Sequence, residues 1–103
     1  MCRSLETGGD WRCTPLGGAI EAGPVFFYTR LKSPSDTRVE HRWYRGDRLQ
    51  QTRTLHISAN QGTGYRTYSR ATMGADRTGE WRVELRAMDG QLLHQERFTV
   101  VSP

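Results

Sequence analysis

The sequence predicts an all-β protein, and three observations lead to that class. Short segments rich in aromatic and β-branched residues alternate between apolar and polar positions, which is the period of a half-buried strand. Clusters of Gly, Pro, Asn, Asp and Ser separate these segments at regular intervals. No helical period lasts longer than one turn. With 103 residues, the chain is expected to form a single domain around one hydrophobic core.

The first part of the chain is predicted to be an irregular N-terminal arm that packs on the domain. Residues 1–23 are rich in Gly, Thr and Pro and have no sustained period, whereas the strand patterns fill residues 24–103. One short strand is expected near Trp11–Cys13. We interpret the large side chain of Trp11 as the anchor that holds the arm on the core, rather than as a platform for a ligand.

Two strands are predicted directly after the arm. Residues 25–31 are aromatic and β-branched, which suits a pleated and half-buried surface. A break that contains Pro34 follows, and residues 37–45 then alternate strictly between apolar and polar positions. The core-facing residues of this second strand are predicted to be Val39, His41 and Trp43.

The middle of the chain is predicted to contain two further strands. Residues 52–59 resume the alternation after a turn. A polar break with two glycines at 60–64 separates them from the alternating residues 65–70. A loop is then expected at 73–79.

The last two strands, residues 80–87 and 91–101, are predicted to form a hairpin around an Asp-Gly turn signal. Leu93 and Phe98 are both apolar but lie an odd number of residues apart. A β-bulge is therefore expected near residues 95–97, because it would return both side chains to one face. The core-facing residues of this hairpin are predicted to be Trp81, Val83, Phe98 and Val100.

These elements amount to six to seven short strands, the number depending on the one in the arm. The small size and the closing hairpin favour a small antiparallel β-sandwich of the immunoglobulin-like kind. The chain lacks the Cys…Trp…Cys spacing of antibody domains. The tripeptide Arg45-Gly46-Asp47 lies between two strand patterns, and we interpret it as the bend that joins them rather than as an adhesion signal.

Several motifs occur in a fixed order along the chain. They are Val39-Glu40-His41-Arg42-Trp43-Tyr44, Tyr65-Arg66-Thr67-Tyr68-Ser69-Arg70, Gly79-Glu80-Trp81-Arg82-Val83, Asp89-Gly90 and Phe98-Thr99-Val100. Together they resemble the bacterial family known as domain of unknown function 2914 (DUF2914), over roughly residues 2–100. The resemblance implies a compact β-sandwich that is often found at the C-terminal end of bacterial proteins, some of which have membrane-spanning segments. It implies no activity and no catalytic residues.

Cys2 and Cys13 are the two cysteines of the sequence. They are too few for a disulfide scaffold and lack the ligand pattern of a structural zinc site. One bridge between them would stabilise the fold by up to about 3 kcal/mol and would imply an oxidising compartment. Free thiols are the alternative, and the sequence leaves both open.

The formal net charge is +4, and every basic residue except Lys32 is an arginine. The outward rows Arg38-Glu40-Arg42 and Arg82-Glu84-Arg86 could form ion pairs across antiparallel strands, each contributing about 0.2–1 kcal/mol. Alternatively, arginine and tyrosine side chains form a face that stacks on sugars or bases and binds carboxylate or phosphate groups. The candidate binding residues are Arg42, Tyr44, Arg66, Tyr68 and Arg70.

Catalytic and metal-binding patterns are missing from the sequence, so we expect no enzyme activity, no cofactor and no metal site. There is no Gly-x-Ser-x-Gly elbow, no His-Glu-x-x-His and no phosphate-binding glycine loop. Ser69 lies within a predicted strand, where a nucleophile is not presented. His41 is expected to be buried and hydrogen-bonded, and His56 and His94 lie on other strands. No signal peptide and no apolar run of membrane-spanning length occur.

The function that we expect is that of a non-enzymatic accessory domain of a larger bacterial protein. It would contact a protein or an anionic polymer of the cell envelope through its Arg and Tyr side chains. A nucleic-acid or phosphate-binding module and a purely structural spacer are the alternatives, and the interleaved acidic residues argue against nucleic acid. The periplasmic or envelope-facing side is favoured over the cytoplasm.

Overall fold

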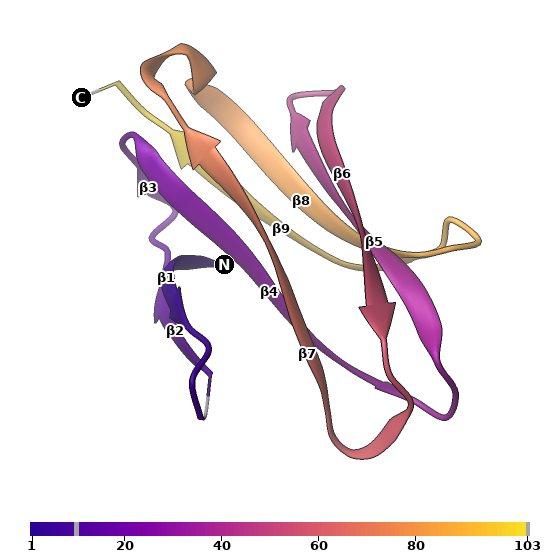
Figure 1. Cartoon of the computed structure of the whole chain (residues 1–103). Helices are drawn as coiled ribbons and strands as arrows, with labels where there is room; N and C mark the ends of the chain where they lie inside the picture. Colours follow the sequence, from indigo (N-terminus) through magenta and orange to yellow (C-terminus); the bar gives the residue numbers. More distant parts are fainter. Residues whose placement is uncertain (10, 103) are drawn as a thin grey trace.

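Two β-sheets make up the computed structural model, which describes residues 1–9 and 11–102 (Figure 1). Positions 10 and 103, which belong to the predicted arm and to the end of the predicted sandwich, lie outside the described residues. The strands are β1 (Cys2–Glu6), β2 (Arg12–Pro15), β3 (Ala19–Ile20), β4 (Gly23–Ser33), β5 (Thr37–Arg45), β6 (Arg48–Ile57), β7 (Asn60–Met73), β8 (Gly79–Ala87) and β9 (Leu92–Val100), with a 3₁₀ turn at Ala75–Arg77. The predicted all-β class is confirmed.

The strand order defines the two layers. One sheet has four strands in the order β2-β1-β4-β7, and the other has five in the order β3-β9-β8-β5-β6. All pairs are antiparallel except β3 with β9, which are parallel. The side chains between the layers form one hydrophobic cluster with contributions from both sheets. No helix long and apolar enough to cross a bilayer is found in the part of the chain that the structure describes.

The arm is more regular than predicted: the short strand expected near Trp11–Cys13 is present as β2, but β1 and β3 were not expected. The count of six to seven purely antiparallel strands is wrong. The arm contains β1, β2 and β3, which bring the total to nine strands in the described residues. Cys2 of β1 pairs with Phe26 of β4, and Ile20 of β3 pairs in parallel with Val100 of β9. These short strands complete the edges of sheets that later residues build. Their pairing partners are distant in the sequence, so the local pattern does not reveal them.

The predicted break at 60–64 lies inside β7, where it is an irregularity in the pairing: Asn60 pairs with Ser33 of β4, and the next pair is Tyr65 with Leu31. Gly64 allows the close approach of the two strands. Its φ of +103° is a glycine conformation, and a Cβ atom there would lie 2.5 Å from Cγ of Arg30. The predicted bulge at 95–97 is misplaced. Leu85 pairs with His94 and Arg86 with Leu92, so the unpaired extra residue is Leu93.

Seven predicted core residues lie between the layers. Val39, His41, Trp43, Trp81, Val83, Phe98 and Val100 are each at most 4% exposed. The rings of Trp81 and Phe98 stack with centroids 6.1 Å apart, and the ring of Trp43 meets Phe98 edge-on at 6.4 Å. Burial of such large rings contributes on the order of 2–3 kcal/mol each, which explains how a chain with 35% hydrophobic residues forms a core.

The tripeptide Arg45-Gly46-Asp47 is the connection between β5 and β6. Gly46 has a φ of +57°, which suits the first position of a tight two-residue hairpin loop. The Arg45 side chain points back into the fold, where Nε and Nη2 donate to the carbonyl oxygen of Thr78 at 2.9 and 2.6 Å. Because the Arg45 guanidinium is hydrogen-bonded within the domain, it is not presented to a partner, and the tripeptide serves as a turn.

Candidate functional site

The five predicted binding residues do not lie on one face, which corrects the sequence-based interpretation. Arg42 and Tyr44 point outward from β5 in the five-stranded sheet. Arg66, Tyr68 and Arg70 point outward from β7 in the four-stranded sheet. The outer surfaces of the two layers of a sandwich face opposite directions, so the two groups are separated by the whole core.

The outer surface of β5 and β8 is a network of ion pairs. The carboxylate of Glu84 is 5% exposed and lies between two arginines, 3.0 Å from Nε of Arg82 and 2.7 Å from Nε of Arg86. A second pair joins Arg42 to Glu40 at 3.0 Å. In the register, Arg42 is directly opposite Glu84 and Glu40 is directly opposite Arg86, so the two charge rows complement each other.

Arg42, Arg82 and Arg86 of the five-stranded sheet are thus paired with carboxylates of the same surface. Burial raises the pKa of Glu84, but the hydrogen bond from Arg86 and the charges of Arg86 and Arg82 outweigh it and keep the pKa below its usual value. The guanidinium of Arg82 also stacks 4.4 Å from the ring centroid of Tyr44. Arg42 and Tyr44 therefore already have partners within the domain.

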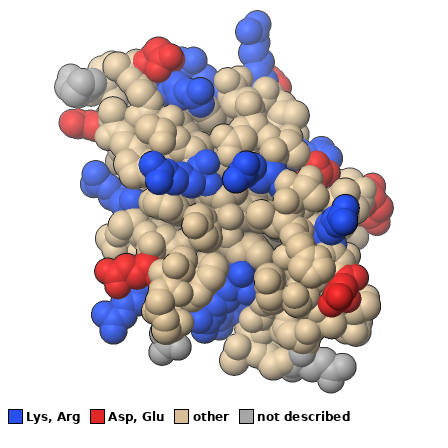
Figure 2. Space-filling view, viewed as in Figure 1, with Lys and Arg blue, Asp and Glu red and all other residues tan. Residues whose placement is uncertain are grey.

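The outer surface of β4 and β7 has a different composition. We call it the arginine–aromatic face, and it consists of Trp11, Phe26, Tyr28, Arg30, Arg66, Tyr68 and Arg70. The antiparallel register places Phe26 opposite Arg70, Tyr28 opposite Tyr68 and Arg30 opposite Arg66. Figure 2 views the side on which β4 and β7 lie in front, and basic side chains form a row across its middle while acidic ones lie nearer its outline.

The aromatic rings of this face contact one another. The Trp11 ring lies 5.4 Å from that of Tyr28 and 5.8 Å from that of Tyr68, so it packs on the outer surface of the sheet and not on the core, which corrects the prediction. The Tyr68 ring is 6.1 Å from Phe26, and the guanidinium of Arg70 lies 5.7 Å from the Phe26 centroid. Tyr68 remains 42% exposed, so the cluster presents an aromatic surface to solvent.

The arginines of this face have no carboxylate partner among the described residues. Arg30 and Arg66 occupy directly opposed positions, an arrangement of like charges that opposes pairing of the strands. Arg30 donates to the hydroxyl of Tyr28 at 3.2 Å, which orients its guanidinium without neutralising it. An anion bound here would relieve this repulsion, and the planar guanidinium groups suit carboxylate or phosphate oxygens.

Beneath this face, a polar network crosses the core and joins the two sheets. The ring of His41 is fully buried and lies 2.7 Å from Ser69 Oγ and 3.0 Å from Thr29 Oγ1. Trp43 Nε1 donates to Ser69 Oγ at 3.0 Å, and Thr29 Oγ1 lies 3.0 Å from Thr67 Oγ1. Burial lowers the pKa of His41 from 6.5 to about 4, so the imidazole is neutral at physiological pH.

The donors of this network fix the tautomer of the histidine. An indole N–H can only donate, so Ser69 Oγ accepts from Trp43 and its own proton is available for Nδ1 of His41. The ring proton then lies on Nε2 and is donated to Thr29, whose hydroxyl donates onward to Thr67. With the other tautomer, the Ser69 proton would have no acceptor in the described part of the chain. Every group of the network is satisfied, and Ser69 is only 2% exposed.

Three members of the arginine–aromatic face were not identified from the sequence. Phe26, Tyr28 and Arg30 alternate with Val25 and Phe27 along a strand that was recognised. Because both sets contain large apolar residues, composition does not show which set is outward. The register with β7 provides that information.

The cysteines lie beside this face. Cys2 and Cys13 are joined by a disulfide that ties β1 to β2. Cys2 is fully buried, and the hairpin that the bridge closes carries Trp11 onto the tyrosines. Clusters of three or more His, Cys, Asp or Glu side chains suited to a metal ion do not occur in the residues that the structure describes.

Comparison with known proteins gives one match. No curated protein and no solved structure matches the chain. The model of the family described as "Protein of unknown function (DUF2914)" matches residues 36–100. The match confirms the resemblance found in the sequence motifs, although it begins after β4 and so leaves out the arm and half of the arginine–aromatic face. The chain belongs to the DUF2914 family.

Proposed function

We propose that this domain is a non-enzymatic binding module whose arginine–aromatic face takes an anionic glycan polymer of the bacterial envelope. The observation that carries the proposal is the pairing of aromatic rings with three arginines that have no acidic partner among the described residues. Aromatic rings stack on sugar rings, and arginines bind the carboxylate or phosphate substituents that such polymers carry.

The contrast between the two outer surfaces supports this choice of face. On β5 and β8 three arginines of the outward rows, Arg42, Arg82 and Arg86, form ion pairs with glutamates. On β4 and β7, Arg30 and Arg66 are opposed at the same level of the sheet. Binding an anion between them removes a repulsion instead of breaking an existing ion pair, so the gain in free energy is larger on this face.

An envelope-side location and an immunoglobulin-like topology belong to the same proposal. The bridge between Cys2 and Cys13 is compatible with an oxidising compartment. The pairing of β4 with β7 in one sheet and the order β9-β8-β5-β6 in the other support the proposal of an immunoglobulin-like arrangement. We infer an accessory role by analogy of fold, which by itself does not assign a function.

The proposal is tested by an amide-shift titration of ¹⁵N-labelled protein. The probes are a hexamer of galacturonic acid, a neutral hexasaccharide and an eight-nucleotide thymidine strand, each at 50 and 300 mM salt. The acidic hexamer is expected to shift the amides of Tyr28, Arg66, Tyr68 and Arg70, and to do so more strongly than the neutral sugar. A nucleic acid would lose affinity steeply with salt through counterion release.

Matched variants separate the two surfaces. Replacing Arg66 by Gln should weaken binding of the acidic hexamer by about tenfold, in line with the loss of one charge-assisted contact. Replacing Arg42 by Gln changes the net charge equally but acts on the opposite surface, so binding should be unchanged. Equal effects of both variants, or tighter binding of the thymidine strand than of the glycan, would refute the proposal. No shifts with any probe would favour a structural spacer.

A further inference from the structure

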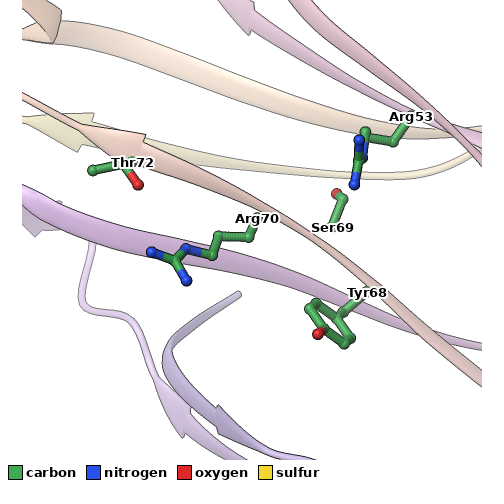
Figure 3. Close-up of a pocket in the computed structure, with 5 residues that line it drawn as sticks. All are labelled: Arg53, Tyr68, Ser69, Arg70 and Thr72. Atoms are coloured by element: carbon green, nitrogen blue, oxygen red, sulfur yellow. The ribbon is translucent and has the colours of Figure 1, made fainter.

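The outer edge of β7 is open. β7 is the last strand of the four-stranded sheet, and no strand pairs with its far side in the described residues. A groove of about 470 Å³ runs along this edge, lined by Arg53, Tyr68, Ser69, Arg70 and Thr72 (Figure 3). Arg53 comes from β6, which belongs to the other sheet, so the groove lies between the edges of the two layers.

The backbone of this edge has the donors and acceptors that an added strand needs. The carbonyl oxygen of Arg70 faces outward, because it accepts a hydrogen bond from the side-chain amide of Gln51 at 3.1 Å. Alternate residues of a strand direct their polar groups to the same side, so Tyr68 and Thr72 also present N–H and C=O groups to this edge. A side-chain amide at the Arg70 carbonyl occupies the position that a backbone N–H of a partner strand would take.

Two arginine side chains lie near this edge on opposite sides of the four-stranded sheet. In Figure 3, Arg53 points toward Ser69, while Arg70 extends over β4, where its guanidinium lies 5.7 Å from the Phe26 ring centroid, so that it must turn toward the edge to meet an added strand. Neither forms an ion pair with a carboxylate in the described part of the chain. Side chains of a strand added to β7 would alternate between these two sides. Acidic residues at neighbouring positions of that strand could therefore reach Arg53 and Arg70.

The same charges argue against a second copy of this chain as the occupant. Antiparallel pairing of two β7 edges would bring Arg66 and Arg70 of both copies together, and the formal charge of each chain is +4. Like charges across paired strands are destabilising. Charge complementarity instead favours an extended segment with carboxylates.

We propose that the edge of β7 binds an extended acidic peptide segment of another protein by strand addition. The backbone groups at Tyr68, Arg70 and Thr72 supply the hydrogen bonds, and the added strand displaces the Gln51 side-chain amide from the Arg70 carbonyl oxygen. Arg53 and Arg70 select for carboxylates on the two sides of the added strand. This mode combines sequence-independent affinity from the main chain with specificity from alternate side chains. It does not require the glycan-binding role of the arginine–aromatic face.

The test uses the acetylated and amidated peptide Thr-Val-Glu-Glu-Val-Thr, whose neighbouring glutamates point to opposite sides of a strand, in an amide-shift titration of the full chain. Shifts are expected at Tyr68, Arg70 and Thr72, with saturation in the micromolar to millimolar range. Two N-methylated versions of the peptide form a matched pair, one with methyl groups on the odd residues only and one with methyl groups on all residues. The first keeps one edge with main-chain donors and should bind like the parent, whereas the second has no main-chain donor on either edge and should not bind.

Protein variants provide the second control. Replacing Arg53 by Gln should weaken binding of the glutamate peptide about five- to tenfold and have little effect on a glutamine version of it. Replacing Arg48 by Gln, at the start of β6, removes the same charge and should leave peptide binding unchanged. Equal binding of the two N-methylated peptides, or equal effects of the two arginine variants, would overturn the proposal. Replacing Arg30 by Gln should leave peptide binding intact, so failure of the glycan proposal is distinguishable from failure of this one.

Discussion

At the scale of single residues, His41 shows how a polar group is accommodated in a core built from few apolar side chains. Its two ring nitrogens form hydrogen bonds with hydroxyl groups from two strands of the opposite sheet, β4 and β7. A buried and fully satisfied network holds the two layers in one relative position, because a sliding movement would leave buried donors unpaired. The residue is therefore best explained as a structural bridge between the sheets.

His41 gives the domain a pH-dependent stability. Its folded-state pKa of about 4 is below its value of 6.5 in the unfolded chain. As the pH falls from 6.5, the unfolded state takes up a proton that the folded state does not bind, so the free energy of unfolding decreases. The decrease is complete below about pH 4 and amounts to about 3 kcal/mol.

Urea unfolding at pH 7.0, 5.5 and 4.5 measures this dependence. Replacing His41 by Gln should lower stability at pH 7 and flatten the decrease between pH 6.5 and 4.5. Replacing the exposed His94 by Gln should leave the decrease unchanged. The carboxylates contribute equally in all three proteins and cancel in the comparison. A wild-type slope in the His41 variant would show that another group is responsible.

At the scale of elements, the two central strand pairs carry the same outward residue types but differ in which charges face each other. Both β4–β7 and β5–β8 carry outward arginines beside aromatic rings. In β5–β8 the register sets Arg42 against Glu84 and Arg86 against Glu40, so unlike charges face each other. In β4–β7 it sets Arg30 against Arg66. The difference follows from which residues face each other and not from composition.

The stabilising role of the ion-pair network can be measured by replacing Glu84 with Gln. The buried carboxylate neutralises two arginines that are about a quarter exposed, so solvent screens part of the interaction. We expect the free energy of unfolding to fall by about 1–2 kcal/mol. Replacing the exposed Glu6 by Gln serves as the matched control. Identical denaturant midpoints for the two variants would mean that the network contributes no stability.

The sequence patterns predicted the β1–β2 hairpin least well. The contribution of its disulfide bridge to stability can be measured. Replacing Cys2 and Cys13 together by Ala should lower the free energy of unfolding by about 1–3 kcal/mol. It should also release Trp11 from the two tyrosines, which shifts tryptophan emission to the red, while Trp43 and Trp81 stay buried. A loss of stability without a change in emission would show that Trp11 holds its position without the bridge.

At the scale of the whole molecule, the sandwich directs its two outer surfaces away from each other and leaves β7 open at one side (Figure 1). This arrangement separates three regions with different chemistry: a self-neutralised surface, an arginine–aromatic face and a strand edge beside a groove. A ligand on the face and a peptide on the edge would both contact Arg70. Occupation of one region is therefore expected to influence the other.

The sequence by itself determined the all-β class, most strand positions and, for strands that alternate between apolar and polar residues, the side that is buried. Val39, His41 and Trp43 alternate with polar residues, and a strand has no other way to place them in the core. The family was also recognisable from its ordered motifs.

Only the tertiary structure decided which strands are neighbours, because pairing joins residues that are distant in the sequence. The short strands of the arm became visible only beside β4 and β9, and Phe26, Tyr28 and Arg30 became part of a face only opposite β7. The prediction that Arg42 and Arg66 share one face is wrong for the same reason. Both side chains point outward, but β5 and β7 belong to different sheets, and the outer surfaces of the two sheets face opposite directions.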